Sequence, residues 1–272
     1  MTKRVAILDL YNNEPNEGMR CIKEIISNFG AQNQTQLSFE VFGVRHLNQI
    51  PDLGFDIYIG TGGPGSPLDS AGSAWEENYF GLMNGILHHN AQNPDAPKHV
   101  FLICHAFQIF CRYYELGKVS QRKSTSFGVM PIHKTDAGEL ESFFEGLNEP
   151  FWAVDSRDWQ VTQPNMGNIM RMNGSVLAIE KYRPTVNLER AMMAMRFGEA
   201  IFGTQFHPEA DPVGMLQYLR RADKKAMVIK NHGEEKYDEM VDKLDDNDKI
   251  VLTHHTILPN FLHSAVNALA LA

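Results

Sequence analysis

The chain of 272 residues is 43% hydrophobic, 10% aromatic and 21% charged, a composition that excludes a disordered or fibrous protein. Its 25 Lys and Arg against 33 Asp and Glu give a net charge of −8, and no basic block interrupts the acidic background, so binding to nucleic acid or to an anionic membrane surface is not expected. The longest apolar runs, such as residues 100–103, fall far short of the roughly 20 residues that cross a bilayer.

The N-terminus runs directly into an apolar, strand-like segment at residues 5–10, which is too short for the core of a signal peptide. We therefore expect a cytoplasmic protein. The three cysteines, Cys21, Cys104 and Cys111, form no CxxC pair, so neither a disulfide framework nor a thiolate zinc site is expected.

Strand-length apolar runs alternate with helix-length amphipathic stretches over residues 5–116. The expected strands are residues 5–10, 39–44, 55–60 and 99–104, and the expected helices are residues 17–29, 75–89 and 106–116. This alternation is typical of βαβ units around a parallel sheet, and it predicts an α/β fold.

From about residue 125 onward, strand-like pieces follow one another with few helices between them. These pieces are residues 127–133, 151–154, 176–182, 191–197 and 201–206, and they predict an antiparallel addition to the same sheet. Beyond Asp211 the pattern becomes helical, with Pro212 in a first helical turn. In the last helix, one face is expected to carry Asn260, Leu262, Ala265, Val266 and Leu269.

A hydrophobic strand at residues 100–103 leads into Cys104 and then into a helix-compatible stretch that contains Gln108. A nucleophile on such a sharp strand-to-helix turn is held above the edge of the sheet, where the first amides of the helix stabilise a thiolate and a developing oxyanion. The alternative is a buried core cysteine, as free cysteines commonly are. This segment alone leaves both interpretations open.

A second segment, residues 60–67, is too rich in Gly and Pro for a helix or a strand. Glycines allow backbone amides to approach a ligand, as an oxyanion hole or a phosphate cradle requires. The segment does not match the GxxxxGK[ST] or GxGxxG patterns, so no nucleotide cofactor is predicted. Taken alone, it is typical of a simple turn.

A third segment ends a strand and places His207 two residues before Glu209, with Pro208 between them. A carboxylate at this spacing orients an imidazole and stabilises its charged form while the imidazole takes a proton from a thiol. The pairs His88-His89 and His254-His255 lack such a context, and we interpret them as surface or core residues and not as metal ligands.

Together, the Gly-Gly-Pro-Gly-Ser loop, the strand-Cys104-turn and the Gln-Phe-His-Pro-Glu segment resemble the class I glutamine amidotransferase family over about residues 3–220. They are most similar to its free-standing homologues of the GMP synthase glutaminase domain. The resemblance implies a doubly wound, flavodoxin-like, mostly parallel sheet with an antiparallel addition. It also implies an amidotransferase-like domain over residues 1–221 and a helical C-terminal extension over residues 222–272.

The resemblance also implies residue roles and a reaction. Cys104 would be the nucleophile, His207 the general base and acid, Glu209 the residue that orients it, Gly63 and His105 the oxyanion-binding amides, and Gln108, Ser126 and Phe127 the substrate-binding residues. Glutamine would form a γ-glutamyl thioester and release ammonia, with no metal or other cofactor.

Only about 50 residues follow the amidotransferase-like part, and they contain no nucleotide-binding motif, so the ammonia acceptor would be a separate synthetase subunit. Two alternatives stay open: a γ-glutamyl peptidase or acyltransferase that uses the same triad, or a catalytically silent homologue that senses a metabolite or regulates a partner. The sequence decides neither the acceptor nor whether the protein is a homo-oligomer.

Three positions depart from the family pattern. Leu102 and Ala106 stand where the family usually has glycine, two residues before and two after the nucleophile, and His105 is an unusual neighbour for it. Glycines there relieve crowding at the strained turn. We expect Ala106 to be tolerated and Leu102 to reshape the turn or the pocket entrance.

Overall fold

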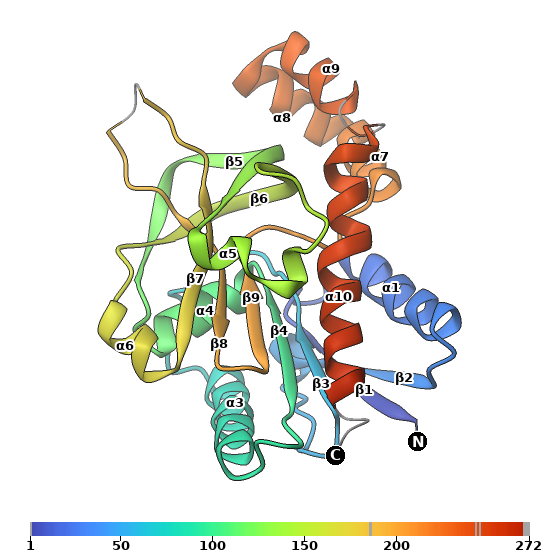
Figure 1. The fold of residues 1–272 in the computed structure, drawn as a ribbon. Helices are drawn as coiled ribbons and strands as arrows, with labels where there is room; N and C mark the ends of the chain where they lie inside the picture. The colour runs from blue at the N-terminus through green and yellow to red at the C-terminus, as the bar shows by residue number, and fades with distance from the viewer. Residues whose placement is uncertain (1, 185–186, 243, 245, 269–272) are drawn as a thin grey trace.

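The computed structural model describes residues 2–184, 187–242, 244 and 246–268 and shows a mixed 9-stranded sheet with helices on both faces (Figure 1). The strands are β1 (Lys3–Asp9), β2 (Leu37–Gly43), β3 (Ile57–Gly60), β4 (His99–Ile103), β5 (Lys118–Lys134), β6 (Phe151–Thr162), β7 (Gly174–Glu180), β8 (Met192–Phe197) and β9 (Ile201–Thr204).

The sheet has the strand order β2-β1-β3-β4-β9-β8-β7-β5-β6. The strands from β2 to β9 in this order pair in parallel, and those from β9 to β6 pair antiparallel. Strand β9 therefore joins the two halves. The predicted α/β fold, with a parallel sheet, an antiparallel addition and a helical C-terminal segment, is confirmed.

The helices are α1 (Gly18–Gln32), α2 (Val44–Leu47), α3 (Ala74–Gln92), α4 (His105–Tyr113), α5 (Asp136–Glu139), α6 (Met166–Arg171), α7 (Pro212–Arg220), α8 (Ala222–His232), α9 (Glu234–Asp242) and α10 (Leu252–Ala268). No helix among the described residues is long and apolar enough to span a membrane.

The parallel half of the sheet is covered on both faces, which explains why its central strands are apolar throughout. In β4, Phe101 and Ile103 belong to the hydrophobic core that α1 and α10 cover, whereas Val100 and Leu102 belong to the core under α3 and α4. This alternation follows from the period of two along a strand.

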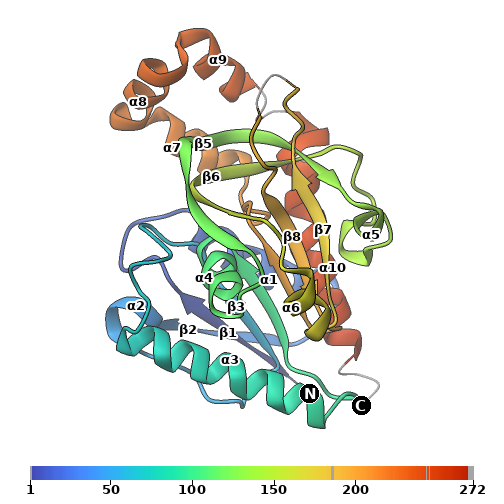
Figure 2. The same ribbon diagram turned by 90° about the vertical axis from the view of Figure 1, so that its left-hand side faces the viewer.

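A third hydrophobic cluster holds α7, α8 and α9 against β5 and β6. It contains Phe127 of β5, Val154 of β6, Leu219 of α7, Val228 of α8 and Met240 of α9. Figure 2 shows these helices above the upper parts of β5 and β6, away from the parallel half of the sheet. The C-terminal segment thus covers one end of the sheet before α10 returns along its face (Figure 1).

Two strands are longer than the sequence pattern predicts. Strand β5 begins at Lys118 and not near residue 127, and β6 continues to Thr162 and not to residue 154. The first half of β5 is polar and largely exposed, and β6 carries the charged side chains of Asp155 and Arg157 in its middle. Neither stretch shows the apolar alternation by which strands are predicted.

The expected apolar face of the last helix is partly correct. Leu262 and Ala265 are fully buried in α10, Val266 packs against the same core, and Asn260 is half-buried. Leu269 lies outside the described residues. The largest buried side chains of this helix are those of Ile257, Leu258 and Phe261, which the pattern did not single out.

Candidate active site

Cys104 forms a strained turn between β4 and α4. Its φ of 48° and ψ of −96° lie where few residues other than glycine are found. The Cys104 amide donates to the Thr204 carbonyl at 2.7 Å, and the Gln108 amide donates to the Cys104 carbonyl at 2.9 Å. The turn is thereby fixed from β9 on one side and by the first turn of α4 on the other. This is the geometry of a nucleophile elbow.

The space for Leu102 and Ala106 comes from glycines on the neighbouring strands. A Cβ placed on Gly60 of β3 would lie 2.9 Å from the Ala106 Cβ and 3.4 Å from a Leu102 methyl group. A Cβ placed on Gly203 of β9 would lie 3.4 Å from the Leu102 Cβ and 2.7 Å from the Phe107 ring. The Leu102 side chain therefore packs in the hydrophobic core on the face of the sheet that α3 and α4 cover, and it is not among the residues that line the pocket at Cys104.

His207 and Glu209 follow β9, which lies directly beside β4. The Nδ1 atom of His207 lies 2.8 Å from Oε1 of Glu209, whose side chain is buried. The His207 amide donates to the Val154 carbonyl at 2.8 Å, which fixes this segment against β6. Because Nδ1 faces the carboxylate, the other ring nitrogen is left for Cys104.

The charges around His207 favour its protonated form. Burial lowers the pKa of His207, but the charges of Glu209 and Cys104 and hydrogen bonds to both outweigh burial and leave that pKa well above its ordinary value of 6.5. The surroundings of His207 therefore favour the charged imidazolium form of its ring.

The two residues expected to bind an oxyanion both lie near Cys104, one in its pocket and one next to it in the chain. Gly63 lines the same pocket as Cys104, and a Cβ there would collide with the Leu10 carbonyl, so only glycine lets the backbone pass. His105 is the first residue of α4, where the backbone N–H has no partner within the helix. Its ring is buried, neither ring nitrogen has a hydrogen-bond partner among the residues that the structure describes, and burial lowers its pKa to about 3.

The three expected substrate-binding residues differ in position. Gln108 and Phe127 line the pocket at Cys104, whereas Ser126 lines a neighbouring cavity. Gln108 Nε2 donates to Oε1 of Gln205 at 3.2 Å, and Gln205 Nε2 donates to the Cys104 sulfur at 3.7 Å. The Ser126 hydroxyl donates to Asp155 at 2.6 Å, so this side chain is part of a buried polar network.

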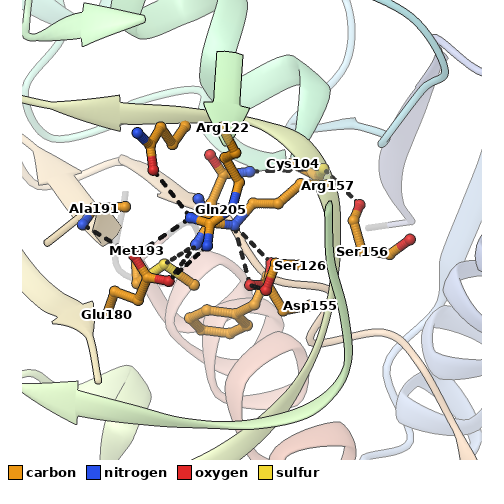
Figure 3. A network of polar contacts seen from close by, with 12 residues as sticks. Cys104, Arg122, Ser126, Asp155, Ser156, Arg157, Glu180, Ala191, Met193 and Gln205 are labelled. Carbon is orange, nitrogen blue, oxygen red and sulfur yellow. Dashed lines mark hydrogen bonds and ion pairs between the residues drawn. The ribbon is translucent and has the colours of Figure 1, made fainter. Parts of the chain in front are cut away.

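Figure 3 shows this network beside Cys104, and its Arg157 also lines the Cys104 pocket. Arg157, with a side chain 1% exposed, donates to Asp155 at 2.8 Å, and its guanidinium lies 3.6 Å from Glu180. Arg122 lies 3.0 Å from the same glutamate, and these basic side chains lower the pKa of Glu180 against the effect of burial, which raises it. The buried charges are therefore balanced within the network.

The pocket at Cys104 has a volume of about 210 Å³ and is built from both halves of the molecule. The loop after β3 contributes Gly63 and Gly65, β6 contributes Arg157, Asp158 and Trp159, and the C-terminal helices contribute Tyr218, Lys224 and Met227. A second cavity of about 180 Å³ lies beside His207 and Glu209, and its lining is mostly apolar. The two cavities share Phe127, Ser156 and Tyr218.

Three residues of the site were not predicted from the sequence. Gln205 lies within the Gln-Phe-His-Pro-Glu segment but shows its contact with Cys104 only in the structure. Tyr11 lines the cavity at His207, and burial together with the charges of Glu209 and Cys104 raises its pKa, so its hydroxyl stays protonated. The His254 ring of α10 hydrogen-bonds through Nδ1 to the Glu209 carbonyl at 2.8 Å. Of these three residues, only Gln205 could have been noticed in the sequence, because it is the first residue of that segment.

The part of the chain that the structure describes contains no group of three or more His, Cys, Asp or Glu side chains placed to hold a metal ion.

No protein-family model matches the sequence, and no curated protein matches it significantly. Solved structures do match. A glutamine amidotransferase from Thermotoga maritima is similar with a TM-score of 0.67 and 13% identity, over 97% of this chain and 98% of that one. A glutamine amidotransferase from Methylobacillus flagellatus is similar with a TM-score of 0.65 and 12% identity, over 98% and 94%.

The glutaminase domain of a Trypanosoma brucei CTPS with bound acivicin is similar with a TM-score of 0.54 and 12% identity, over 76% of this chain and 86% of that one. At these identities the likeness concerns the fold. The chain has the fold of glutamine amidotransferase structures, as its resemblance to the class I family implies.

Proposed function

We propose that this protein is a glutaminase of the class I amidotransferase type, with Cys104 as the nucleophile. The observation that carries the proposal is the strained backbone of Cys104, with φ 48°, directly beside a His207–Glu209 pair that is joined at 2.8 Å. A structural core cysteine gains nothing from a strained turn, whereas a nucleophile needs one to stand clear of its strand. The shared fold supports the same reading.

The proposed reaction begins with attack of the Cys104 thiolate on the γ-carboxamide carbon of glutamine. A carbon–sulfur bond forms, and the negative charge on the oxygen is held by the backbone N–H groups of Gly63 and His105. When the carbon–nitrogen bond breaks, His207 gives its proton to the nitrogen and ammonia leaves. Glu209 keeps the imidazole oriented throughout.

Water then completes the cycle. His207 takes a proton from the water as its oxygen attacks the thioester, the carbon–sulfur bond breaks, and glutamate leaves. One glutamine and one water thus give one glutamate and one ammonia. The similar CTPS structure is a glutaminase domain, which supports the release of ammonia by this fold. We further propose that a separate synthetase subunit uses the ammonia.

A second candidate, hydrolysis of a larger γ-glutamyl amide, is favoured by the cavity beside His207. The leaving group departs on the side of the residue that protonates it, and on this side the chain has a mostly apolar cavity of about 180 Å³ lined by Val154, Met215 and Tyr218. Ammonia needs no such space, whereas an apolar amine would bury its surface there.

The deciding experiment measures glutamate and ammonia release from glutamine by the purified chain. We expect release by the wild type and none by Cys104→Ala. Cys111→Ala is the matched control, because this thiol is buried on α4 and lies outside the pocket. Release by Cys104→Ala equal to that of the control would overturn the proposal.

The same protein samples distinguish the alternatives. Cleavage of γ-glutamyl-p-nitroanilide without cleavage of glutamine would select the second candidate. A Cys104 that reacts with iodoacetamide no faster than Cys21 or Cys111, in a chain that cleaves neither compound, would indicate a catalytically silent protein.

A further inference from the structure

Helix α8 reaches the pocket that contains Cys104. Lys224 and Met227 of α8 line this pocket together with Tyr218 of α7. Val228, on the same helix, is fully buried in the hydrophobic cluster that holds these helices against β5 and β6. The side of α8 that faces the pocket is therefore held in place by a packed core.

One of the two cations that line the pocket is Lys224, and the carboxylate next to it in the chain, Asp223, is paired with Arg221 at 3.1 Å. Lys224 makes no ion pair with another described residue, and its Nζ lies 5.1 Å from the centroid of the Tyr218 ring. The other cation in the lining, Arg157, is held by Asp155 at 2.8 Å and has a side chain only 1% exposed. Lys224 is thus the cation that is left to meet an anionic ligand.

The same pocket contains an exposed carboxylate. Asp158 of β6 accepts a hydrogen bond from the Thr125 hydroxyl at 2.5 Å, which fixes its orientation, and it makes no ion pair with another described residue. A carboxylate and an ammonium on the walls of one pocket match a ligand that carries both charges. The free amino-acid end of glutamine or of a γ-glutamyl compound is such a ligand.

We propose that Lys224 binds the α-carboxylate of the substrate and that Asp158 binds its α-ammonium, which makes α8 an element of substrate specificity. This assignment rests on the proposed function for the identity of the substrate. It predicts that the enzyme selects a free amino-acid end and discriminates against γ-carboxamides that lack either charge.

The first test compares Lys224→Met with Lys225→Met in the whole chain of 272 residues. Methionine keeps the unbranched stem of lysine and removes its charge. Lys225 is the matched control, because its Nζ lies over the Tyr237 ring at 4.7 Å, outside the Cys104 pocket. We expect Lys224→Met to lower kcat/KM for glutamine by about 10- to 100-fold, mainly through KM, and Lys225→Met to leave it unchanged.

The substrate provides the complementary change. The wild type should prefer glutamine over glutaminamide, in which the α-carboxylate is replaced by a neutral amide, and Lys224→Met should lose this preference. Asp158→Asn should likewise lose the preference for glutamine over N-acetylglutamine. If Lys224→Met keeps the full preference in an active enzyme, the assignment is wrong while the proposed glutaminase stands.

The second test does not depend on turnover. Cys104 is alkylated with iodoacetate or with iodoacetamide, in each case by displacement of iodide from carbon by sulfur, and the rates are measured by mass spectrometry of the Cys104 peptide. An anion-binding Lys224 raises the ratio of the iodoacetate rate to the iodoacetamide rate. We expect Lys224→Met to lower this ratio by about 3- to 10-fold and Lys225→Met to leave it unchanged.

A lowered ratio in a chain that cleaves no γ-glutamyl compound would support the anion site and count against the proposed reaction. An unchanged ratio would overturn the anion site whether or not the chain is a glutaminase.

Discussion

At the scale of single residues, the turn that carries Cys104 depends on a large side chain that packs beside two glycines on the neighbouring strands. Leu102 is fully buried, and the glycines that leave room for it are Gly60 and Gly203 on the strands to either side. We predict that Leu102→Gly lowers the free energy of unfolding by about 3–5 kcal/mol, because it leaves a cavity and adds a glycine to a central strand. Urea denaturation measures the change.

The control for this prediction is Leu102→Met, which conserves volume and should cost less than about 1.5 kcal/mol. Because Leu102 packs away from the pocket, folded Leu102→Gly should keep its rate of alkylation at Cys104. Wild-type stability in Leu102→Gly would show that the side chain does not fill the space between the two glycines.

At the scale of elements, α10 contributes an aromatic anchor to the parallel half of the sheet. The Phe261 ring lies 5.1 Å from Phe101, 5.7 Å from Phe143 and 6.4 Å from the His99 ring, measured between centroids. We predict that Phe261→Ala lowers the free energy of unfolding by about 3–5 kcal/mol. His263→Ala, at an exposed position of the same helix, should change it by no more than about 0.5 kcal/mol.

Elements were predictable from the sequence where one physical signal dominates. Strands β3 and β4 are buried on both faces, and α1 buries a regular stripe that includes Ile22, Ile25 and Phe29, so both patterns are visible in the chain. The central part of β6 was missed because Asp155 and Arg157 read as surface charges. They are buried only because each neutralises the other, and this pairing is a property of the folded sheet.

Some residues of the candidate site were likewise predictable from the sequence, and others were not. Cys104, His207 and Glu209 lie in short segments whose residue types already suggest chemistry. Lys224 carried no signal, because its significance comes from the position of α8 over β5 and β6. Contacts between distant segments of the chain decide such a role, and periodicity reports only on local structure.

At the scale of the whole molecule, buried histidines make the fold sensitive to acid. Burial, with help from Arg196 and against Asp56, lowers the pKa of His99 to about 4 from its ordinary value of 6.5. Below about pH 6.5 the unfolded chain binds a proton at this residue that the folded chain does not bind until about pH 4. Stability contributed by neutral His99 is therefore present above pH 6.5 and is lost as the pH falls, by about 3 kcal/mol in total.

We predict that His99→Asn makes the free energy of unfolding less dependent on pH between about pH 6.5 and 4, by up to about 1.4 kcal/mol per pH unit. His88→Gln, a change at an exposed histidine, should leave the dependence as in the wild type. Denaturant titrations at several pH values measure both, and equal slopes in all three proteins would contradict a neutral buried His99.

The position of β9 between the two halves of the sheet also determines when, during synthesis, Cys104 and His207 come together. Strands β4 and β9 are neighbours in the sheet, but the whole antiparallel half lies between them in the chain. During synthesis the ribosome therefore releases Cys104 long before His207, and the pairing that brings them together is among the most non-local in the molecule. A nascent chain carries an ordinary cysteine, and its thiol gains its proton-transfer partner only when the last strand of the sheet is inserted.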